Sequence, residues 1–404
     1  MAQPLKKKDT AKKPTLASFK EAMGLINNAG NAKKPSNADK KMEWLIMPKA
    51  FQDALKLPGI PLSYVSTIAG HSNTGKSTLV NHAIVAAQRQ KLIPVIYDTE
   101  NNFDFTYAIN MGMEATPVYG DIEKVVIDPE TGEEITTTEY GIVAYEGNFL
   151  YFNNAILAAR YGRNDYSKGG EVAKCRKQAV IEDIAYSINE LLDAQDEGTI
   201  QNGFVFIWDS VGSIDSWKTY NSKVGNAMFD AGAISAAFNR ILNDRIPRSR
   251  KVSEPYSNTM ILVNKVWNDG MTNPVGPPSL ELKGGHSIFY ASRLIILMGG
   301  QLKASIKKLT ATAKGYTYNY ATQTKIKVIK NQLPSPYTLT YEGDIVCTPT
   351  GFIKADKEEI DAYKKSHISN ILESLNQIAE SSSNVSLDVD TDDITFAESD
   401  EEAE

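Results

Sequence analysis

Continuous apolar runs alternate with segments of helical periodicity along the middle of the chain. Continuous apolar runs over 202–210 and 258–266 are typical of strands buried on both faces of a sheet, and together with them six segments are predicted to be strands. They are "YVSTIAG" (64–70), "KLIPVIYDTE" (91–100), "NGFVFIWDS" (202–210), "NTMILVNKV" (258–266), "RLIILMG" (293–299) and "TKIKVIKNQ" (324–332). Helical patterns over 76–90, 176–194 and 226–243 separate several of them. The alternation predicts an α/β fold with a mostly parallel central sheet flanked by helices.

Three further segments are predicted around this core. Leu16, Phe19, Met23 and Ile26 give residues 15–26 the spacing of a short amphipathic helix, which needs a surface elsewhere, such as another subunit, to cover its apolar stripe. Residues 43–56 suggest a second helix, closed by the turn "LPGIP". Residues 115–175 exceed what a minimal α/β domain needs, and "EKVVIDPETGEEITTTEY" predicts a β-hairpin. This insertion is either a partner-binding element or a passive surface insertion.

Charge is distributed unevenly along the chain, although the net charge is only −6. Residues 1–41 contain ten lysines, and residues 381–404 contain nine acidic residues and no basic one. We therefore divide the chain into a basic arm with a short oligomerisation helix (1–41), an α/β core (42–350), a short helical segment (351–380) and a disordered acidic tail (381–404). The two ends either aid solubility only, or the arm contacts nucleic acid and the tail competes with it.

Composition excludes several classes of protein. The chain of 404 residues is 42% hydrophobic and 23% charged, as in ordinary globular proteins, and no apolar run is long enough to cross a membrane. Its two cysteines, Cys175 and Cys347, are far apart and lack metal-like spacing, so free thiols in a reducing cytoplasm are expected.

The loop after the first strand carries the most specific chemistry. Gly70, Gly75, Lys76 and Ser77 follow the order G-x-x-x-x-G-K-[ST] of a phosphate-binding loop. Lys76 is expected to reach the β- and γ-phosphates of ATP, and the Ser77 hydroxyl to bind Mg²⁺. The expected nucleotide-binding residues of the loop are Gly70, His71, Ser72, Asn73, Thr74, Gly75, Lys76, Ser77 and Thr78.

Two acidic residues at strand ends complete the expected ATPase site. Asp209 closes the strand "FVFIW", where a carboxylate can organise the metal and its water shell. Glu100 follows the strand after the loop helix, so it should face the same crevice and activate an attacking water. The alternative for Glu100 is a helix-capping or surface acid.

Several ordered segments resemble the RecA family of homologous recombinases. They are "FQDALKLPGIPLSYVSTIAGHSNTGKST", "DTENNFDFTYAINMG", "WDSVGSI", "ILVNKV" with "KGGHSIFYASRL", and "TKIKVIKNQLPSPY". The resemblance covers roughly residues 45–350, is broken by 115–175, and points to a phage member of the UvsX kind. It implies a RecA-like P-loop ATPase core that forms helical filaments on single-stranded DNA. Such a filament hydrolyses ATP in a DNA-dependent way and catalyses homologous pairing and strand exchange in recombination and DNA repair.

The resemblance also implies roles around the nucleotide. Glu100 would activate water, and Asp104 and Tyr107 would contact the adenine. Lys330 would reach the γ-phosphate held by a neighbouring subunit, whereas the second trans lysine of the family falls at Gln332. The γ-phosphate sensor, glutamine in bacterial members, falls at Lys265.

For DNA, the resemblance implies contacts from two loops, 211–227 and 267–283, and from a glycine pair. Arg240 matches a phosphate-binding arginine, although a companion arginine is replaced by Ala233. Trp217 and Trp267 either stack on bases or anchor their loops. The expected DNA-binding residues are Trp217, Lys218, Lys223, Arg240, Trp267, Met271, Gly284, Gly285 and His286. Single-stranded and duplex DNA, further copies of the chain, and a loader or single-strand-binding protein are the expected partners.

Two other functions share these motifs. A hexameric DNA helicase has the same core, but it normally carries an arginine finger and an N-terminal ring-forming domain. A DNA-associated ATPase without strand exchange is permitted by Lys265, Gln332 and Ala233. Filaments, rings or dispersed monomers on DNA distinguish the three.

Overall fold

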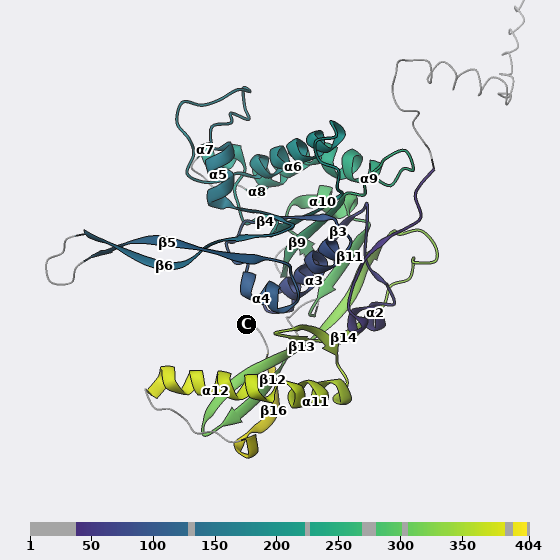
Figure 1. The fold of residues 1–404 in the computed structure, drawn as a ribbon. Helices are drawn as coiled ribbons and strands as arrows, with labels where there is room; N and C mark the ends of the chain where they lie inside the picture. The colour runs from purple at the N-terminus through teal and green to yellow at the C-terminus, as the bar shows by residue number, and fades with distance from the viewer. Residues whose placement is uncertain are drawn as a thin grey trace, which may run out of the picture.

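A long mixed β-sheet forms the centre of the protein in the computed structural model, which describes residues 38–127, 134–222, 227–268, 280–300, 306–383 and 391–401 (Figure 1). Its parallel strands lie side by side in the order β11 (Leu294–Met298), β3 (Val65–Gly70), β9 (Thr259–Asn268), β8 (Phe204–Asp209), β4 (Ile93–Asp98) and β7 (Leu150–Asn153). Antiparallel strands extend the sheet beyond β11: β13 (Tyr316–Asn331), β14 (Glu342–Thr348) and β15 (Gly351–Lys354). The predicted mostly parallel α/β core is therefore present, and β15 carries it past residue 350.

Helices cover both faces of the parallel strands because their side chains alternate between two apolar cores. In β8, Phe204, Phe206 and Trp208 pack into one core, and Val205 and Ile207 pack into the other. One face is covered by α3 (Lys76–Arg89) and α2 (Lys49–Leu55). The opposite face is covered by α5 (Asn154–Tyr161), α6 (Ile181–Asp196), α8 (Ala227–Ala237), the π-helix Ile241–Arg245, α9 (Ile246–Arg248) and α10 (Gly285–Ala291).

Two predicted helices have different boundaries in the structure. Residues 43–56 are not one helix, because β1 (Trp44–Ile46) pairs with β2 (Gly59–Pro61) and α2 starts only after Pro48. The helix expected from residue 176 starts at Ile181. Arg176 instead forms a buried ion pair with Asp183, whose carboxylate also accepts a hydrogen bond from the Val180 N–H. The helix therefore begins only after the residues that form this anchor.

The insertion forms the predicted hairpin, in which β5 (Thr116–Ile127) pairs with β6 (Glu134–Glu146) and projects away from the body (Figure 1). Strand register places five apolar side chains on one face of this ribbon: Tyr119, Val125, Ile127, Tyr140 and Ile142. All five are exposed, up to 72% for Tyr140. None of these five side chains therefore packs into a core.

The C-terminal part builds a second, smaller α/β layer at the far end of the long strand β13, at the bottom of Figure 1. Strand β12 (Ile306–Ala313) pairs with β13, and α11 (Lys357–Ser366) and α12 (Ile368–Ser383) pack on them around a separate core that includes Leu309, Tyr320 and Leu375. The predicted disordered tail over 381–404 needs correction: the turn Thr391–Asp393 is followed by β16 (Thr395–Glu401), which pairs with β12. Lysine side chains on β12 offset the acidic charge, as in the ion pair between Lys307 and Glu398.

The remaining short elements are α4 (Phe105–Asn110), α7 (Trp217–Ser222) and β10 (Leu280–Leu282). Among the helices that the structure describes, none combines the length and apolarity that crossing a membrane requires. The helix expected over 15–26 lies outside the described residues.

Candidate nucleotide and DNA site

The predicted phosphate-binding loop, residues 70–78, lies where β3 ends and α3 begins. Gly75 precedes α3 with φ of 90°, and Asn73 has φ of 61°, so the backbone turns sharply between strand and helix. A Cβ atom on Gly75 would lie 2.4 Å from Cys347 Sγ, so no larger residue fits without rearrangement. Ser72, Asn73 and Ser77 are exposed along this loop. The loop therefore presents backbone N–H groups and hydroxyls to solvent at a helix N-terminus.

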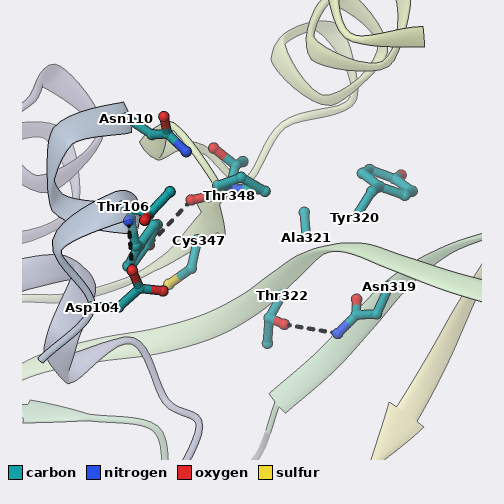
Figure 2. Close-up of a pocket in the computed structure, with 11 residues that line it drawn as sticks. Asp104, Thr106, Asn110, Asn319, Tyr320, Ala321, Thr322, Cys347 and Thr348 are labelled. Carbon is teal, nitrogen blue, oxygen red and sulfur yellow. Dashed lines mark hydrogen bonds between the residues drawn. The ribbon is translucent and has the colours of Figure 1, made fainter. Parts of the chain in front are cut away.

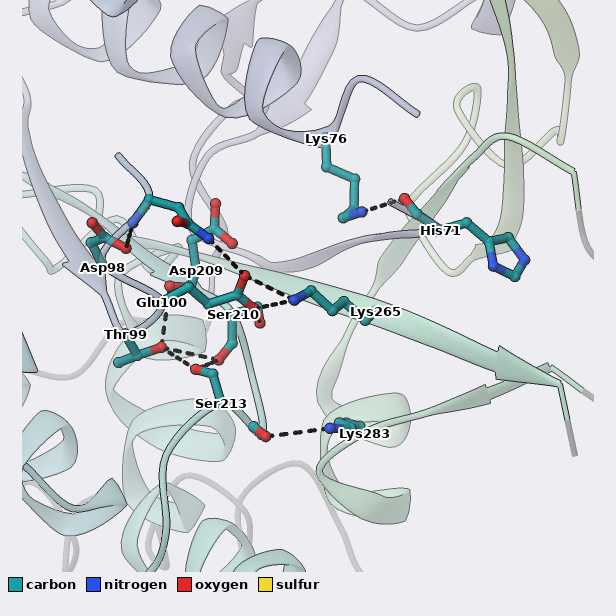
Figure 3. Close-up of polar contacts among 12 residues, drawn as sticks. His71, Lys76, Asp98, Thr99, Glu100, Asp209, Ser210, Ser213, Lys265 and Lys283 are labelled. Atoms are coloured by element: carbon teal, nitrogen blue, oxygen red, sulfur yellow. Dashed lines mark hydrogen bonds and ion pairs between the residues drawn. The ribbon is translucent and has the colours of Figure 1, made fainter. Parts of the chain in front are cut away.

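Lys76 reaches over this loop and donates a hydrogen bond to the carbonyl oxygen of His71 at 2.5 Å (Figure 3). Burial lowers the pKa of Lys76 to about 8. Attraction by Asp209 opposes this shift, and repulsion by Lys265 adds to it. Lys76, Asp209 and Lys265 therefore share one electrostatic site, although they come from three different elements.

Glu100 lies at the centre of a cluster of hydrogen bonds beside Lys76 (Figure 3). Lys265 Nζ lies 2.8 Å from Oε1 and 2.9 Å from Oε2 of the Glu100 carboxylate. The Ser210 hydroxyl donates to Oε1, and Asn102 Nδ2 donates to Oε2 at 3.5 Å. Burial alone raises the pKa of Glu100, but the hydrogen bonds from Lys265 and Ser210 outweigh it and hold the pKa below its ordinary value. Glu100 is therefore an ionised carboxylate held by an ammonium group.

The turn that carries Glu100 is fixed by neighbouring strand ends. Asp98 at the end of β4 lies opposite Asp209 at the end of β8 in the strand register. The Asp98 carboxylate accepts hydrogen bonds from Asn102 N (3.1 Å), Phe103 N (2.9 Å) and the Tyr151 hydroxyl (2.9 Å). These bonds hold the chain on both sides of Glu100. Asp104 caps α4 by accepting from the Tyr107 N–H at 2.9 Å, so Glu100 is not the cap of that helix.

Asp209 faces the same crevice from the end of β8. Burial raises the pKa of Asp209 to about 6, and the negative charge of Glu100 adds to the shift. The mutual repulsion of the Glu100 and Asp209 carboxylates favours a cation between or beside them. The donor set of Ser77 hydroxyl and Asp209 carboxylate consists of hard oxygen ligands, which fit Mg²⁺.

Asp104 and Tyr107 line a cavity of about 410 Å³ beside the loop (Figure 2). The Tyr107 hydroxyl is hydrogen-bonded to Thr78 Oγ1 at 2.8 Å and to the Thr348 carbonyl at 3.2 Å. Thr78 is itself buried, so this hydroxyl pair connects the loop helix to α4 and β14 rather than facing solvent. The opposite wall comes from the C-terminal layer and includes Asn319 and Tyr320. The cavity has the size and mixed lining of a site for a planar heterocycle.

Lys330 lies at the opposite edge of the sheet from its own phosphate-binding loop. In register, Gly70 at the start of the loop pairs with Met298, whereas Lys330 pairs with Ile295. Ile295 and Met298 are three residues apart along β11, so Lys330 and Gly70 are separated by about 10 Å in the strand direction. Lys330 Nζ bonds the Phe289 carbonyl, lies 3.4 Å from the Tyr290 carbonyl and lies 4.5 Å from the centre of the Phe289 ring. The ammonium therefore points to the surface at the amino edge of β11.

The predicted DNA-binding residues of the first loop lie in different surroundings. Trp217 packs against the Arg176 guanidinium, 5.1 Å from its ring centre, and against the edge of Tyr166. This contact favours the anchoring alternative for Trp217, although the side chain is only half-buried. Lys218 is exposed with its ammonium 3.7 Å from the centre of the Phe229 ring, and Arg240 is exposed after α8. Lys223 lies outside the described residues.

The second loop is described only at its two ends. Trp267 belongs to β9 and pairs with Glu281 of β10, and Met271 lies outside the described residues. Gly284 and Gly285 follow β10 with φ of 92° and 73°. A Cβ atom on Gly284 would lie 2.4 Å from Ile288 Cδ1, which explains a glycine there by packing as well as by conformation. His286 is exposed at the start of α10.

Several residues that shape the site were not predicted from the sequence. Thr99 Oγ1 donates to the carbonyl groups of Asp209 and Ser210 at 3.1 Å and accepts from Trp208 Nε1 at 3.2 Å, which ties β4 to β8. Asn264 links β9 to Lys283 through two backbone contacts, at 2.7 and 2.9 Å. Thr99 precedes Glu100 and Ser210 follows Asp209 in the sequence. Their position next to the predicted acids is the one feature of the sequence that could have indicated them.

Parts of the chain are similar in sequence to known proteins. No family model matches the chain. A segment of 85 residues is 36% identical to Protein RecA of Chlorobaculum tepidum and spans 21% of this chain and 23% of the relative. Protein RecA of Desulforapulum autotrophicum matches with the same identity and the same coverage. Protein RecA of Chloroherpeton thalassium is 25% identical over 298 residues, which cover 72% of this chain and 60% of the relative. The first matches thus span about a quarter of their relatives, and together the similarities support a relationship with the RecA family.

Proposed function

We propose that the chain is an ATP-dependent DNA recombinase of the RecA family, a phage member of the UvsX kind. It assembles as a helical filament on single-stranded DNA, hydrolyses ATP in response to DNA, and catalyses homologous pairing and strand exchange. The observation that carries the proposal is the grouping of Lys76, Glu100 and Asp209 at the carboxyl edge of the parallel strands, with Lys330 at the opposite edge.

The residues of the carboxyl edge have the chemistry that ATP hydrolysis needs. The loop and Lys76 bind the phosphates, and Ser77 with Asp209 would hold a magnesium ion that neutralises their charge. Glu100 accepts a proton from water as the water oxygen bonds to the γ-phosphorus and the bond to the β-phosphate oxygen breaks, which leaves ADP and phosphate. Asp104 and Tyr107 line the cavity proposed for the adenine.

The position of Lys330 supports catalysis between subunits. Its ammonium is at the amino edge of β11, about 10 Å along the strand from the level of its own loop, so the γ-phosphate it serves would belong to another copy. Exposed aromatic side chains surround it, Tyr290 at 70% and Phe289 at 40%. A cation delivered across an interface makes ATP binding and assembly mutually dependent.

DNA binding is proposed for the surface near the ends of β9 and β10. Lys218, Arg240 and His286 are exposed there or on the neighbouring helices, and backbone N–H groups near Gly284 and Gly285 bind phosphate without reading bases. Contacts of this kind predict sequence-neutral binding that weakens with salt. A loader or single-strand-binding protein would act on the same DNA.

Electron microscopy with ATPase assays tests the proposal. The full chain is mixed with single-stranded DNA and a non-hydrolysable ATP analogue and imaged by negative staining, and phosphate release is measured with and without DNA. Helical filaments together with DNA-stimulated hydrolysis are expected. Closed rings would instead identify a helicase, and dispersed particles with DNA-independent turnover would identify an ATPase without strand exchange.

A further inference from the structure

We propose that Lys265 is a latch on the catalytic base: it holds Glu100 in the absence of ATP and releases it when the γ-phosphate attracts the same ammonium group. This inference rests on the proposed ATPase function and assigns to Lys265 a second role, on Glu100, besides that of a phosphate sensor.

The contacts of Glu100 make it a poor base as long as its ion pair with Lys265 is intact. Lys265 lies within 2.9 Å of both carboxylate oxygens, and Ser210 also donates to Oε1. A carboxylate accepts a proton from water only through an oxygen lone pair that faces the water, and an adjacent ammonium makes it a weaker base. Only 17% of the Glu100 side chain is exposed. Little room is therefore left for a water molecule beside these donors.

The strand register places the same ammonium beside the phosphate-binding loop. Lys265 of β9 pairs with Gly70, the first glycine of the loop. Its positive charge is near enough to Lys76 to contribute to the lowered pKa of Lys76. Lys265 is also 42% exposed, so its side chain is not fixed by surrounding protein. A flexible lysine stem between a carboxylate and a polyphosphate will pair with the more highly charged group.

The exchange of partners links two events that must coincide. When Lys265 turns to the γ-phosphate, it stabilises the negative charge there and at the same time frees the Glu100 carboxylate for water. ADP lacks the γ-phosphate and leaves the ion pair intact. A neutral glutamine at this position, as in bacterial RecA proteins, has no positive charge to hold Glu100, so the latch belongs to the lysine.

Nucleotide binding to single and double variants tests the latch without DNA or turnover. Dissociation constants for ATPγS and ADP are measured by isothermal titration calorimetry on the full chain and on Glu100→Gln, Lys265→Met and the double variant. Because Glu100→Gln removes the competitor for the ammonium, we expect it to tighten ATPγS about tenfold, or about 1.4 kcal/mol, and to leave ADP unchanged. Lys265→Met should weaken ATPγS and leave ADP unchanged.

The decisive result is the double variant. If Lys265 is the latch, Glu100→Gln gives no gain in ATPγS affinity once Lys265 is replaced. If Glu100→Gln tightens ATPγS equally in both backgrounds, Glu100 merely repels the phosphate and the latch is refuted. If Glu100→Gln leaves ATPγS affinity unchanged in the wild-type background, the ion pair does not compete with nucleotide and the latch is refuted as well.

Two further variants keep the test valid. Lys265→Gln repeats the cycle with a polar side chain, in case Lys265→Met does not fold. Lys354→Met removes a lysine that pairs with Asp53 and Glu359 at 3.4 Å outside the site, and it should leave both affinities unchanged. Because these assays contain no DNA, a protein that forms no filaments can still show the latch, and a recombinase can lack it.

Discussion

His82 connects the helix of the phosphate-binding loop to the C-terminal edge of the sheet, and its protonation should control stability in mildly acidic solution. The ring lies on α3, and its Nε2 accepts a hydrogen bond from the Phe352 N–H of β15 at 3.0 Å. The Phe352 ring lies 4.9 Å away, and a Cβ atom on Gly351 would lie 2.6 Å from His82 Cε1. Only the neutral imidazole, with an unprotonated Nε2, can accept this hydrogen bond.

The direction and size of the effect follow from linkage. Burial lowers the pKa of His82 to about 4, and the positive charge of Arg89 adds to the shift. An ordinary histidine in the unfolded chain titrates near pH 6.5, so the contribution of His82 is fully present above about pH 6.5 and is lost as the pH falls toward about 4. Between about pH 7.5 and about pH 5 the loss amounts to about 2 kcal/mol of unfolding free energy.

His82→Gln isolates this contribution because glutamine offers an acceptor oxygen that does not titrate in this range. Urea unfolding of the wild type and the variant, followed by circular dichroism at both pH values, gives the two free-energy differences. The wild type should lose about 2 kcal/mol more than the variant on acidification, with similar m-values. Equal losses in the two proteins would refute the reasoning, because the titrating group would then lie elsewhere.

Three other changes have definite expected outcomes. Lys330→Ala should lower DNA-stimulated ATP hydrolysis at least about 100-fold, since a trans cation is worth that much or more, while ADP binding by calorimetry stays unchanged; unaltered turnover would contradict the trans role. Arg176→Met leaves the Asp183 carboxylate buried without its partner, so urea unfolding should show a loss of about 3–5 kcal/mol. Adding Asp183→Asn removes the unpaired charge but keeps an acceptor oxygen for the Val180 N–H, so it should restore part of that loss, and no recovery would show that packing rather than charge is responsible. Truncation after residue 390 removes β16 from the edge of β12 and should lower the melting temperature by roughly 4 °C or more, whereas a free tail would give no change.

The sequence predicted the strands that carry the site because each is a continuous apolar run. Strands β3, β4, β8, β9 and β11 lie where such runs were found, and each needs only its own residues to be recognised. By contrast, β16 consists largely of acidic and polar residues, and its strand conformation comes from pairing with β12, far away in the sequence. Similarly, β1 exists because β2 pairs with it, and helical spacing over 43–56 gave the opposite prediction.

The candidate site divides in the same way. The phosphate-binding loop has a local spacing, so Lys76 and Ser77 could be named without a structure. The ion pair of Glu100 with Lys265 joins residues 165 positions apart, and nothing local to either residue indicates it. The contacts of Trp217 with Arg176 and Tyr166 also join segments that are distant in the sequence, so its surroundings could not be predicted from the loop alone. The surroundings of both side chains depend on contacts between distant segments, which hydrophobic periodicity does not indicate.

The separation of Lys330 from its own loop gives any linear array of this chain a direction. Each copy carries the proposed trans cation at one edge of its sheet and the proposed triphosphate site at the other. In an open row, the terminal copy at one end would lack a donor, so the number of completed pockets is always one fewer than the number of copies. The two ends would then gain and lose protomers at different rates, and nucleotide turnover would change the rates at one end more than at the other.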